Sequence, residues 1–501
     1  MKHNDNLAIG FEAQFKADPN ALALVIDDER WTRREVADLA ARATGLLTGA
    51  GIKPGDRVVA QYDTRVEDIA LALAAARLGA TFMPLPRRMG VREINYILDR
   101  SDARFFAHAG DRPPPGVKPL KGAKLASTFS VFNAEPIDTF PVDMGPDHIS
   151  LIGFTSGSTG QPKGVMVTWS AVSWAAEHMR SFADVQTGEA ILVTGAGAGA
   201  PGFTFFTYLG MSIGAPLVHA GRWDPSKVLA LAHENKCVWT TMVPTMLQML
   251  IDVRPQVLGG GRLEHMRAAT VAGAYMSEEL IQTARDDLGV EILRMYAMAE
   301  CMAHSSMLLT HSQERRDSMD GSPGPGAELG VFDDGGNQVP QGEIGEVGIR
   351  GPSLLSGYLA EAEGKSSLMS RDGFFRSGDL GKITSEGFIK IVGRKKDMIN
   401  RGGYKIDPSE VEEALKAHAA VGKVVVVGYP DKLFGERACA VVEPVAGESL
   451  TFIEMVEFLR EVGFSREKVP ERLECWDALP LSPDGKILKG EVRAQVESLK
   501  T

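Results

Sequence analysis

The sequence predicts an α/β protein with a large N-terminal domain and a small α/β C-terminal domain. We expect the large domain to combine parallel-sheet subdomains with a β-rich subdomain. Apolar runs typical of buried strands alternate with helical repeats until Gly321, where Gly/Pro-rich turns around short strands take over. After Lys396 helix and strand patterns resume, so we place the domain boundary there, giving domains 1–395 and 396–501.

Composition narrows the functional class. The chain has 501 residues, 44% of them hydrophobic and 24% charged, which is typical of a globular protein of about three folding units. A net charge of -11 without a basic segment argues against a nucleic-acid partner. No apolar run approaches membrane length, so we expect a cytoplasmic protein with no membrane partner. The widely spaced cysteines predict buried free thiols, not a zinc or dithiol site: Cys237, Cys301, Cys439 and Cys475.

The N-terminal elements follow from spacing and capping. Thr32 and Glu35 form a capping-box pattern, and apolar residues then recur at helical spacing until Gly49 and Gly51. Strand and helix patterns alternate from there, which favours a mostly parallel sheet. The expected strands are 58–60, 105–107, 191–193, 216–218 and 238–240, and the expected helices are 69–78, 92–98 and 226–234.

Later elements have similar signals. In the turn-rich stretch we expect strands at 346–350 and 387–392. In the C-terminal part Asp407 precedes Pro408 as a helix cap, and Thr451 with Glu454 forms a second capping box. A run of valines at 424–427 predicts the strand between these helices.

The segment from Thr155 to Gly164 consists largely of hydroxyl residues, glycines and one lysine, directly after an apolar stretch. Backbone N–H groups of small residues, hydroxyls and an ammonium suit a polyphosphate. The segment is not a Walker loop, because Lys163 lies between Pro162 and Gly164 and not between Gly and Ser or Thr. The expected phosphate-binding residues are Thr155, Ser156, Gly157, Ser158, Thr159, Gly160 and Lys163.

Six segments, in this order, resemble the motifs of the ANL superfamily of adenylate-forming enzymes, in its acyl-CoA synthetase branch. They are the 155–164 loop, Tyr296-Ala297-Met298-Ala299-Glu300, Arg376-Ser377-Gly378-Asp379, Gly393-Arg394 with Lys396, Gly402-Gly403-Tyr404 and Pro483-Asp484-Gly485-Lys486. The resemblance covers nearly the whole chain. It implies activation of a small carboxylic acid by ATP with release of pyrophosphate, then transfer to CoA. It also implies Mg²⁺ as a cofactor and a mobile C-terminal domain.

The same resemblance assigns nucleotide contacts. Asp379 would accept hydrogen bonds from the ribose hydroxyls and Arg394 would also bind the ribose, while Tyr296 would stack on adenine. Glu300 would be the Mg²⁺ ligand. Gly273, Ala274 and Ala297 complete the expected ATP-binding set. Relatives usually carry Gly and Thr where this chain has Ala297 and Ala299, so a hydroxyl near the adenylate phosphate is missing, and weaker or differently supplied transition-state stabilisation is expected.

Catalysis is assigned to Lys486 together with Glu300. In the family the C-terminal lysine holds the substrate carboxylate against the α-phosphate and offsets developing charge. Lys396 occupies the hinge position. Rotation there would withdraw Lys486 and bring Gly402 and Gly403 towards the adenylate, where the lack of a side chain leaves room for pantetheine.

The acid is predicted from small residues. Relatives often place a His or an aromatic residue where this chain has alternating Gly and Ala at 195–202. A roomy pocket formed by Gly199, Ala272, Gly273 and Met298 predicts a bulky or long apolar acid; a merely flexible loop is the alternative. The stretch also fits G-x-G-x-x-G, but Pro201 and the bulky residues 203–208 argue against a dinucleotide oxidoreductase.

The thiol acceptor is less constrained. The chain has no fused carrier domain. We expect free CoA, because Gly485-Lys486-Ile487-Leu488-Lys489 and the free-standing length resemble the acyl-CoA synthetase branch; an acyl carrier protein is the alternative acceptor. A non-catalytic nucleotide-binding relative is a further alternative, suggested by Ala297 and Ala299. The sequence leaves open whether the protein forms a homodimer.

Overall fold

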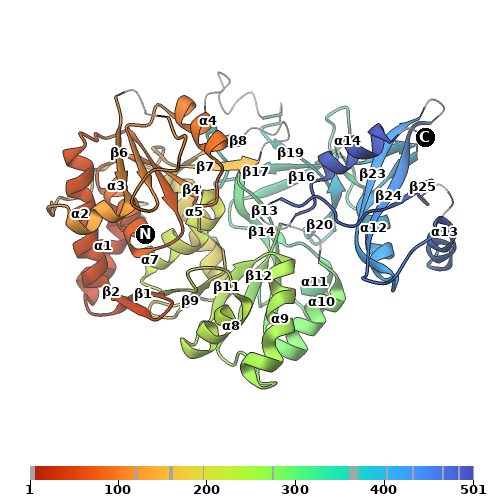
Figure 1. Cartoon of the computed structure of the whole chain (residues 1–501), viewed down its shortest axis with the longest axis horizontal. Helices are drawn as coiled ribbons and strands as arrows, with labels where there is room; N and C mark the ends of the chain where they lie inside the picture. The colour runs from red at the N-terminus through yellow and green to blue at the C-terminus, as the bar shows by residue number, and fades with distance from the viewer. Residues whose placement is uncertain are drawn as a thin grey trace. The chain divides into compact units, whose positions relative to one another are not determined.

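The structure is a computed structural model (Figure 1). It describes residues 6–118, 122–156, 162–195, 197–273, 276–359, 369–370, 372–395, 397–401, 404–431, 434–464, 466, 468–482 and 486–499. The chain divides into two compact units: Met1–Leu329, Ile349–Phe375 and Ser385–Ile389 form one, and Gly330–Gly348, Arg376–Thr384 and Lys390–Thr501 form the other. The predicted boundary at Lys396 stays a prediction, since that residue lies outside the described part.

The longest sheet is mostly parallel, as predicted, with the strand order β15-β14-β13-β12-β11-β9-β10-β1-β2. Strands β13 to β1 run parallel, whereas β2, β14 and β15 pair antiparallel at the ends. Burial on both faces explains the continuous apolar runs of the parallel strands. Their bounds are β1 (Leu22–Ile26), β2 (Glu29–Thr32), β9 (Ile191–Val193), β10 (Leu217–His219), β11 (Trp239–Met242), β12 (Ala268–Val271), β13 (Glu291–Met298), β14 (Cys301–Ser306) and β15 (Ser322–Pro323).

A second sheet has the order β18-β8-β7-β4-β3-β5-β6. Strands β7, β4, β3, β5 and β6 are parallel neighbours, and β8 and β18 extend the sheet antiparallel. The bounds are β3 (Arg57–Tyr62), β4 (Thr81–Pro86), β5 (Phe105–His108), β6 (Lys124–Ser127), β7 (Ile149–Ser156), β8 (Pro162–Thr168) and β18 (Gly357–Tyr358).

Both sheets share a winding pattern that bears on function. In β10-β9-β11-β12 and in β4-β3-β5-β6 the first strand along the chain has the second strand on one side and the third on the other. In parallel sheets of this kind, ligands bind beyond the carboxyl ends of the strands where the winding reverses. The segments after β9 and β3 are therefore placed at positions suited to ligand binding.

The helices begin and end close to their predicted bounds. In α2, Thr32 Oγ1 accepts the N–H of Glu35, and the Glu35 carboxylate accepts the N–H of Thr32 at 2.7 Å, so the predicted capping box is confirmed. The helices of this unit are α1 (Leu7–Ala17), α2 (Arg33–Gly49), α3 (Val66–Arg77), α4 (Val91–Ser101), α5 (Trp169–Phe182), α6 (Gly199–Gly202), α7 (Leu209–Ile213), α8 (Pro225–Glu234), α9 (Pro244–Leu258), α10 (Glu278–Thr283) and α11 (Gln313–Ser318), with shorter 3₁₀ and π segments η1 (Thr128–Asn133), η2 (Phe203–Tyr208) and η3 (Ala284–Leu288).

One core lies between the parallel strands and the helices α8, α9 and α10, which Figure 1 shows in green beside β11 and β12. Leu229, Leu250 and Ile281 come from the three helices and pack with Leu192 and Ala269 from the strands. These side chains are all nearly inaccessible to solvent. The packing holds the carboxyl ends of β9, β11 and β12 in a fixed arrangement.

The β-rich stretch predicted after Gly321 is a sheet in the order β16-β17-β19-β20. Its strands are β16 (Glu328–Phe332), β17 (Gly345–Arg350), β19 (Phe375–Ile383) and β20 (Ile389–Arg394). The predicted strands 346–350 and 387–392 correspond to β17 and β20. This sheet carries Asp379 and Arg394.

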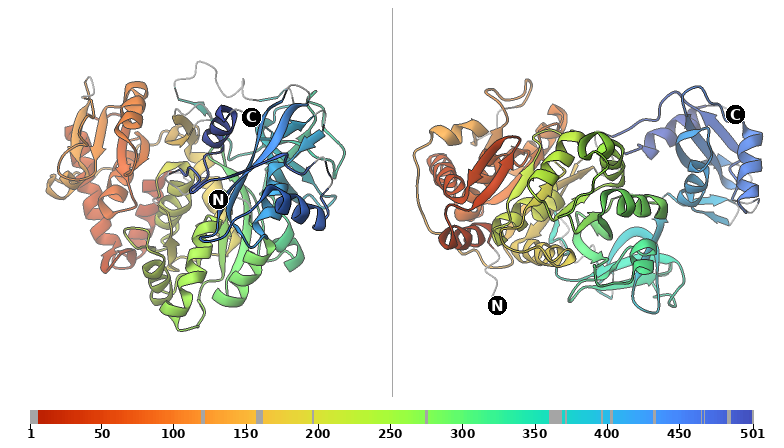
Figure 2. Two further views of the ribbon diagram at one scale, coloured as in Figure 1. Left: turned by 45° about the vertical axis from the view of Figure 1, so that its right-hand side comes forward. Right: turned by 90° about the horizontal axis from the view of Figure 1, so that it is seen from below.

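The C-terminal segment, drawn in blue in Figure 2, is built on the β23–β24 pair with β21, β22 and β25. Helices α12 and α13 pack on one face through residues such as Val411 and Met455, and α14 packs on the other through Val492. The predicted small α/β domain is confirmed. Its elements are β21 (Ile399–Arg401), β22 (Tyr404–Ile406), α12 (Pro408–Lys416), β23 (Val421–Asp431), β24 (Gly435–Pro444), α13 (Phe452–Glu461), β25 (Arg472–Cys475) and α14 (Lys489–Ser498).

The cysteines differ in part from expectation. Cys237, Cys301 and Cys439 are buried and free, as predicted, but Cys475 is exposed. It is the last residue of β25 on the edge of its sheet, where its side chain reaches the surface. Among the residues that the structure describes, no helix has the length and apolarity needed to span a bilayer.

Buried histidines make stability depend on pH. Burial lowers the pKa of His178, His219 and His304 to about 4, and the charge of His304 further lowers that of His178. The unfolded chain binds these protons near pH 6.5. The free energy of unfolding should therefore be unaffected above about pH 6.5 and should fall as the pH drops from there to about 4.

Replacing one of these groups should weaken that dependence. His178→Gln removes a titrating group and should reduce the loss of stability between pH 7 and pH 5, measured by urea unfolding at both values. His233→Gln, on the exposed end of α8, is the matched control and should leave the pH dependence unchanged. An equal loss of stability in wild type and His178→Gln would contradict the assignment.

Candidate active site

The predicted phosphate loop connects two antiparallel strands. β7 ends at Ser156 and β8 begins at Pro162, and Thr155 lies directly across the ladder from Lys163. The backbone positions of Thr155 and Lys163 are thus fixed opposite each other by the same pair of strands. The loop itself, including the predicted residues Gly157, Ser158, Thr159 and Gly160, lies outside the described residues.

Lys163 is linked to Glu300 through a residue that the sequence reasoning missed. The Lys163 Nζ lies 5.0 Å from the ring centroid of Tyr358, and the Tyr358 hydroxyl donates a hydrogen bond to Glu300 Oε1 at 2.9 Å. Glu300 occupies the turn between β13 and β14. The predicted phosphate-binding lysine and the predicted metal ligand are therefore brought to one aromatic side chain.

Tyr296 lies in β13 opposite Ser305 of β14 and is only 7% exposed. Arg294 anchors the same strand. Its side chain lies on the same face as that of Tyr296, because every second residue of a strand points to one face. The Arg294 guanidinium pairs with Asp320 at 2.6 Å, and the Asp320 N–H donates to the Ile389 carbonyl at 2.8 Å. These contacts hold the strand segment leading to Tyr296.

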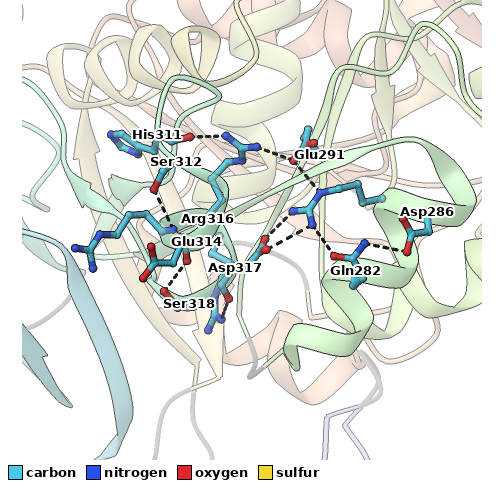
Figure 3. Close-up of polar contacts among 12 residues, drawn as sticks. Gln282, Asp286, Glu291, His311, Ser312, Glu314, Arg316, Asp317 and Ser318 are labelled. Carbon is cyan, nitrogen blue, oxygen red and sulfur yellow. Dashed lines mark hydrogen bonds and ion pairs between the residues drawn. The ribbon is translucent and has the colours of Figure 1, made fainter.

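A polar network supports the start of the same strand (Figure 3). Arg285 of η3 pairs with Asp317 of α11 at 2.6 Å and with Glu291 of β13 at 3.3 Å. Arg316 pairs with the same Glu291 carboxylate at 3.2 Å. The network joins η3 and α11 to β13, so it stabilises the strand that carries Tyr296.

The predicted ribose-binding residues are brought together. Asp379 Oδ1 lies 2.9 Å from Arg394 Nε in an ion pair between β19 and β20. Asp379 is 5% exposed and its N–H donates to Ser377 Oγ at 3.1 Å. The residue lies inside β19, directly after Gly378, whose φ of +73° is in the left-handed region. A carboxylate held in this way can accept hydrogen bonds from a diol.

Lys486 of the C-terminal unit is hydrogen-bonded to Ser482 through its backbone. Its N–H donates to Ser482 Oγ at 3.1 Å, and its carbonyl accepts the Ser482 N–H at 2.7 Å, while its side chain is exposed. Its role stays a prediction. Of the other expected residues, Ala274, Lys396, Gly402 and Gly403 lie outside the described residues.

The glycine-rich stretch after β9 is partly packed and partly open. A Cβ at Gly197 would lie 2.0 Å from Thr64 Oγ1, and a Cβ at Gly153 would lie 2.3 Å from the Ala200 nitrogen. By contrast, a Cβ at Gly195 or Gly199 would meet nothing within 4 Å. Some of these glycines allow close approach of neighbouring segments, and others leave space.

The other expected pocket residues are partly accessible. Ala272 and Met298 are half-buried, and Gly273 is exposed with φ +87°. After Gly199 the chain continues into α6 and then into the π segment η2, whose side chains are all buried. Helical segments of the π type often occur at functional sites. No sequence pattern predicted the π segment η2.

Two glycine substitutions distinguish packed from open positions. Gly197→Ala should destabilise the protein by about 2 kcal/mol or more, because its φ is +59° and the added methyl group clashes with Thr64. Gly195→Ala should change the free energy of unfolding by less than about 0.5 kcal/mol. Chemical denaturation of both variants provides the measurement, and equal effects would contradict the packing described.

The described residues include one that could serve as a ligand for the expected Mg²⁺ ion. Among the residues described, no group of three or more His, Cys, Asp and Glu side chains could hold a metal ion. Mg²⁺ is commonly bound by one or two carboxylates together with substrate phosphates. Glu300 beside a phosphate-type hairpin fits that mode, and a protein-only metal cage does not.

Comparison with known proteins agrees with this arrangement. Residues 11–359 match the family model of AMP-binding enzymes, and residues 410–486 match that of the AMP-binding enzyme C-terminal domain. The interval between the matches includes the predicted boundary at Lys396 without locating it.

Individual relatives cover nearly the whole chain. A feruloyl-CoA synthase of Amycolatopsis sp is 31% identical over 95% of this chain and 96% of its own length. The long-chain-fatty-acid–CoA ligase FadD13 of Mycobacterium tuberculosis is 30% identical over 93% of both chains. The crystal structure of ATP-bound MatB from Rhodopseudomonas palustris has a TM-score of 0.90 and 25% identity, covering 99% of this chain and 100% of that one.

These matches confirm the predicted fold class and leave no basis for the dinucleotide oxidoreductase alternative. The chain therefore belongs to the family of AMP-binding enzymes, within the adenylate-forming superfamily that its motifs resemble.

Proposed function

We propose that this enzyme is an AMP-forming acyl-CoA synthetase whose substrate is a bulky or long apolar carboxylic acid. ATP, Mg²⁺ and CoA are the cofactors of this class of ligase. The observation that carries the adenylation step is the contact of one tyrosine with both Lys163 and Glu300. A cation and a metal-binding carboxylate in this arrangement suit the pyrophosphate end of ATP.

The residues have separate tasks in this mechanism. A carboxylate oxygen of the acid attacks the α-phosphate of ATP, pyrophosphate leaves, and the acyl adenylate forms. Lys163 and the 155–164 hairpin bind the leaving pyrophosphate, and Asp379 and Arg394 fix the ribose. Lys486 holds the attacking carboxylate and offsets charge at the α-phosphate. Bound at Glu300, Mg²⁺ would neutralise phosphate charge.

The second step transfers the acyl group to a thiol. The mixed anhydride is reactive enough for thiol attack, so no covalent enzyme nucleophile is needed. We assign Lys396 to the hinge and Gly402 and Gly403 to the pantetheine path on the resemblance alone. A carrier-protein pantetheine is the alternative acceptor, and a homodimer is a separate proposal that light scattering after gel filtration would test.

Several features support the choice of acid. Gly195 and Gly199 leave space after β9, and Ala272, Gly273 and Met298 are small or flexible. Two relatives act, by their names, on an aromatic and on a long aliphatic acid. The absence at Ala299 of the hydroxyl that relatives carry there leaves part of the transition-state stabilisation to other groups, with Lys486 as the first candidate.

The test is mass spectrometry of reactions with ATP and a panel of aromatic, polycyclic, long-chain and short polar acids, with and without CoA. The proposal predicts AMP, pyrophosphate and acyl-CoA from the larger apolar acids. Acyl-AMP without acyl-CoA from every acid would overturn the CoA acceptor. No pyrophosphate release from any acid would favour a non-catalytic relative.

A further inference from the structure

We infer that Tyr358 is a positioning residue that holds the metal ligand Glu300 and the phosphate-binding Lys163 in their working arrangement. The inference rests on the proposed function, because it concerns the same ATP site. The sequence gives no sign of it, since Tyr358 lies 58 residues from Glu300 along the chain. The juxtaposition exists only in the folded unit.

The backbone of Tyr358 is fixed from both sides. β18 pairs antiparallel with β8, with Tyr358 opposite Val165 and Gly357 opposite Met166. The next residue, Leu359, donates its N–H to the Gly164 carbonyl at 2.7 Å. On the other side, the N–H of Leu355 donates to the Glu300 carbonyl at 2.8 Å. The 355–359 segment is therefore hydrogen-bonded both to the phosphate hairpin and to the Glu300 turn.

The hydroxyl acts on Glu300. A phenol that donates to an ionised carboxylate forms a charge-assisted hydrogen bond, which is stronger than one between neutral groups. The 2.9 Å bond selects one orientation of the Glu300 carboxylate. Carboxylate oxygens have about four acceptor positions, so this bond leaves capacity for a metal ion. Tyr358 thus restricts the rotation of the metal ligand without replacing the metal.

The ring acts on Lys163. An ammonium within about 6 Å of an aromatic centroid is attracted by the negative face of the ring. The 5.0 Å separation places Lys163 in that range, on the strand position opposite Thr155. Loss of the ring would remove one contact that restricts the Lys163 side chain, which loses rotamer freedom when it binds phosphate. The hydroxyl and the ring of Tyr358 therefore have different effects.

Two substitutions separate these effects. Tyr358→Phe removes the bond to Glu300 and keeps the ring below Lys163, so the free Mg²⁺ concentration needed for half-maximal ATP binding should rise about tenfold. Affinity for ATP at saturating Mg²⁺ should stay within about twofold of wild type. Tyr358→Leu removes both contacts and should weaken ATP binding at saturating Mg²⁺ as well. Isothermal titration calorimetry at several Mg²⁺ concentrations measures both quantities and needs no acid.

The matched control is Tyr429→Phe. Tyr429 is a half-buried tyrosine in β23 of the C-terminal unit, with the Arg472 guanidinium 5.8 Å from its ring centroid. It has the same pairing of ring and cation but lies outside the ATP residues. Its loss of hydroxyl should leave the Mg²⁺ dependence unchanged. A shift as large as that of Tyr358→Phe would mean that the response is not specific to the site.

A double-substitution cycle tests whether the hydroxyl works through Glu300. In a Glu300→Gln background, adding Tyr358→Phe should cause less than a twofold further change in Mg²⁺ dependence. An undiminished tenfold change there, or no change in Tyr358→Phe alone, would overturn the positioning role. Failure of the proposed function looks different: the wild-type protein itself would show no Mg²⁺-dependent ATP binding.

Discussion

Lys486→Ala should abolish acyl-adenylate formation, with a loss of about 10³-fold in kcat, and should spare thioester formation from acyl-AMP that is supplied ready-made. A positioned cation at a developing phosphate charge contributes this much in comparable sites. Thiol attack on a preformed mixed anhydride does not need it. Pyrophosphate release measures the first half-reaction, and acyl-CoA formed from synthetic acyl-AMP measures the second.

Two control variants define what the lysine does. Lys486→Arg keeps the charge and alters its shape, so it should retain partial adenylation activity. Lys423→Ala removes another lysine of the same unit, which pairs with Glu443 at 2.6 Å, and should change neither half-reaction. Because the side chain of Lys486 is exposed, the alanine variant should fold normally. Thermal unfolding of the variant would check this. Equal loss of both half-reactions would contradict a role confined to adenylation.

Sequence patterns predicted the helices and strands well, because capping and side-chain periodicity depend on residues that are close together along the chain. Thr32 with Glu35 and Thr451 with Glu454 make the capping contacts within one helical turn, so spacing alone reveals them. Sheet order is a different matter. β1 is paired with β10, nearly 200 residues later, and nothing in either segment specifies its neighbour. The π segment η2 also lacks a sequence signal.

Site residues that belong to ordered sequence motifs were predicted. A site residue whose role depends on contacts with residues far away along the chain was missed. Asp379 and Arg394 were expected to act on the same ribose, and the structure pairs them. Tyr358 was missed because its significance depends on Lys163 and Glu300, both far away along the chain. The stretch 195–202 was expected to leave room in a pocket, but the missing side chain of Gly197 accommodates Thr64, a contact that only the folded chain reveals.

Asp379→Ala should weaken ATP binding about 100-fold without unfolding the chain. The carboxylate is expected to accept two hydrogen bonds from the ribose, and bonds to a charged group contribute about 1.5–3 kcal/mol each. Folding should tolerate the change, because Arg394, the partner left behind, has a half-exposed side chain that water can solvate. Calorimetric titration with ATP measures the affinity.

Deoxynucleotides make this prediction specific to the ribose. Wild-type protein should bind 2′-deoxy-ATP and 3′-deoxy-ATP more weakly than ATP. Each analogue lacks one of the ribose hydroxyls that would donate a hydrogen bond to Asp379. Asp379→Ala should discriminate much less among the three nucleotides, since only Arg394 would be left to contact the ribose. Glu343→Ala, at an exposed acid of the same unit, is the matched control and should keep the wild-type preference. A variant that lost affinity but kept the full wild-type preference for ATP over both deoxynucleotides would show that another group recognises the ribose and that Asp379 acts only by holding Arg394.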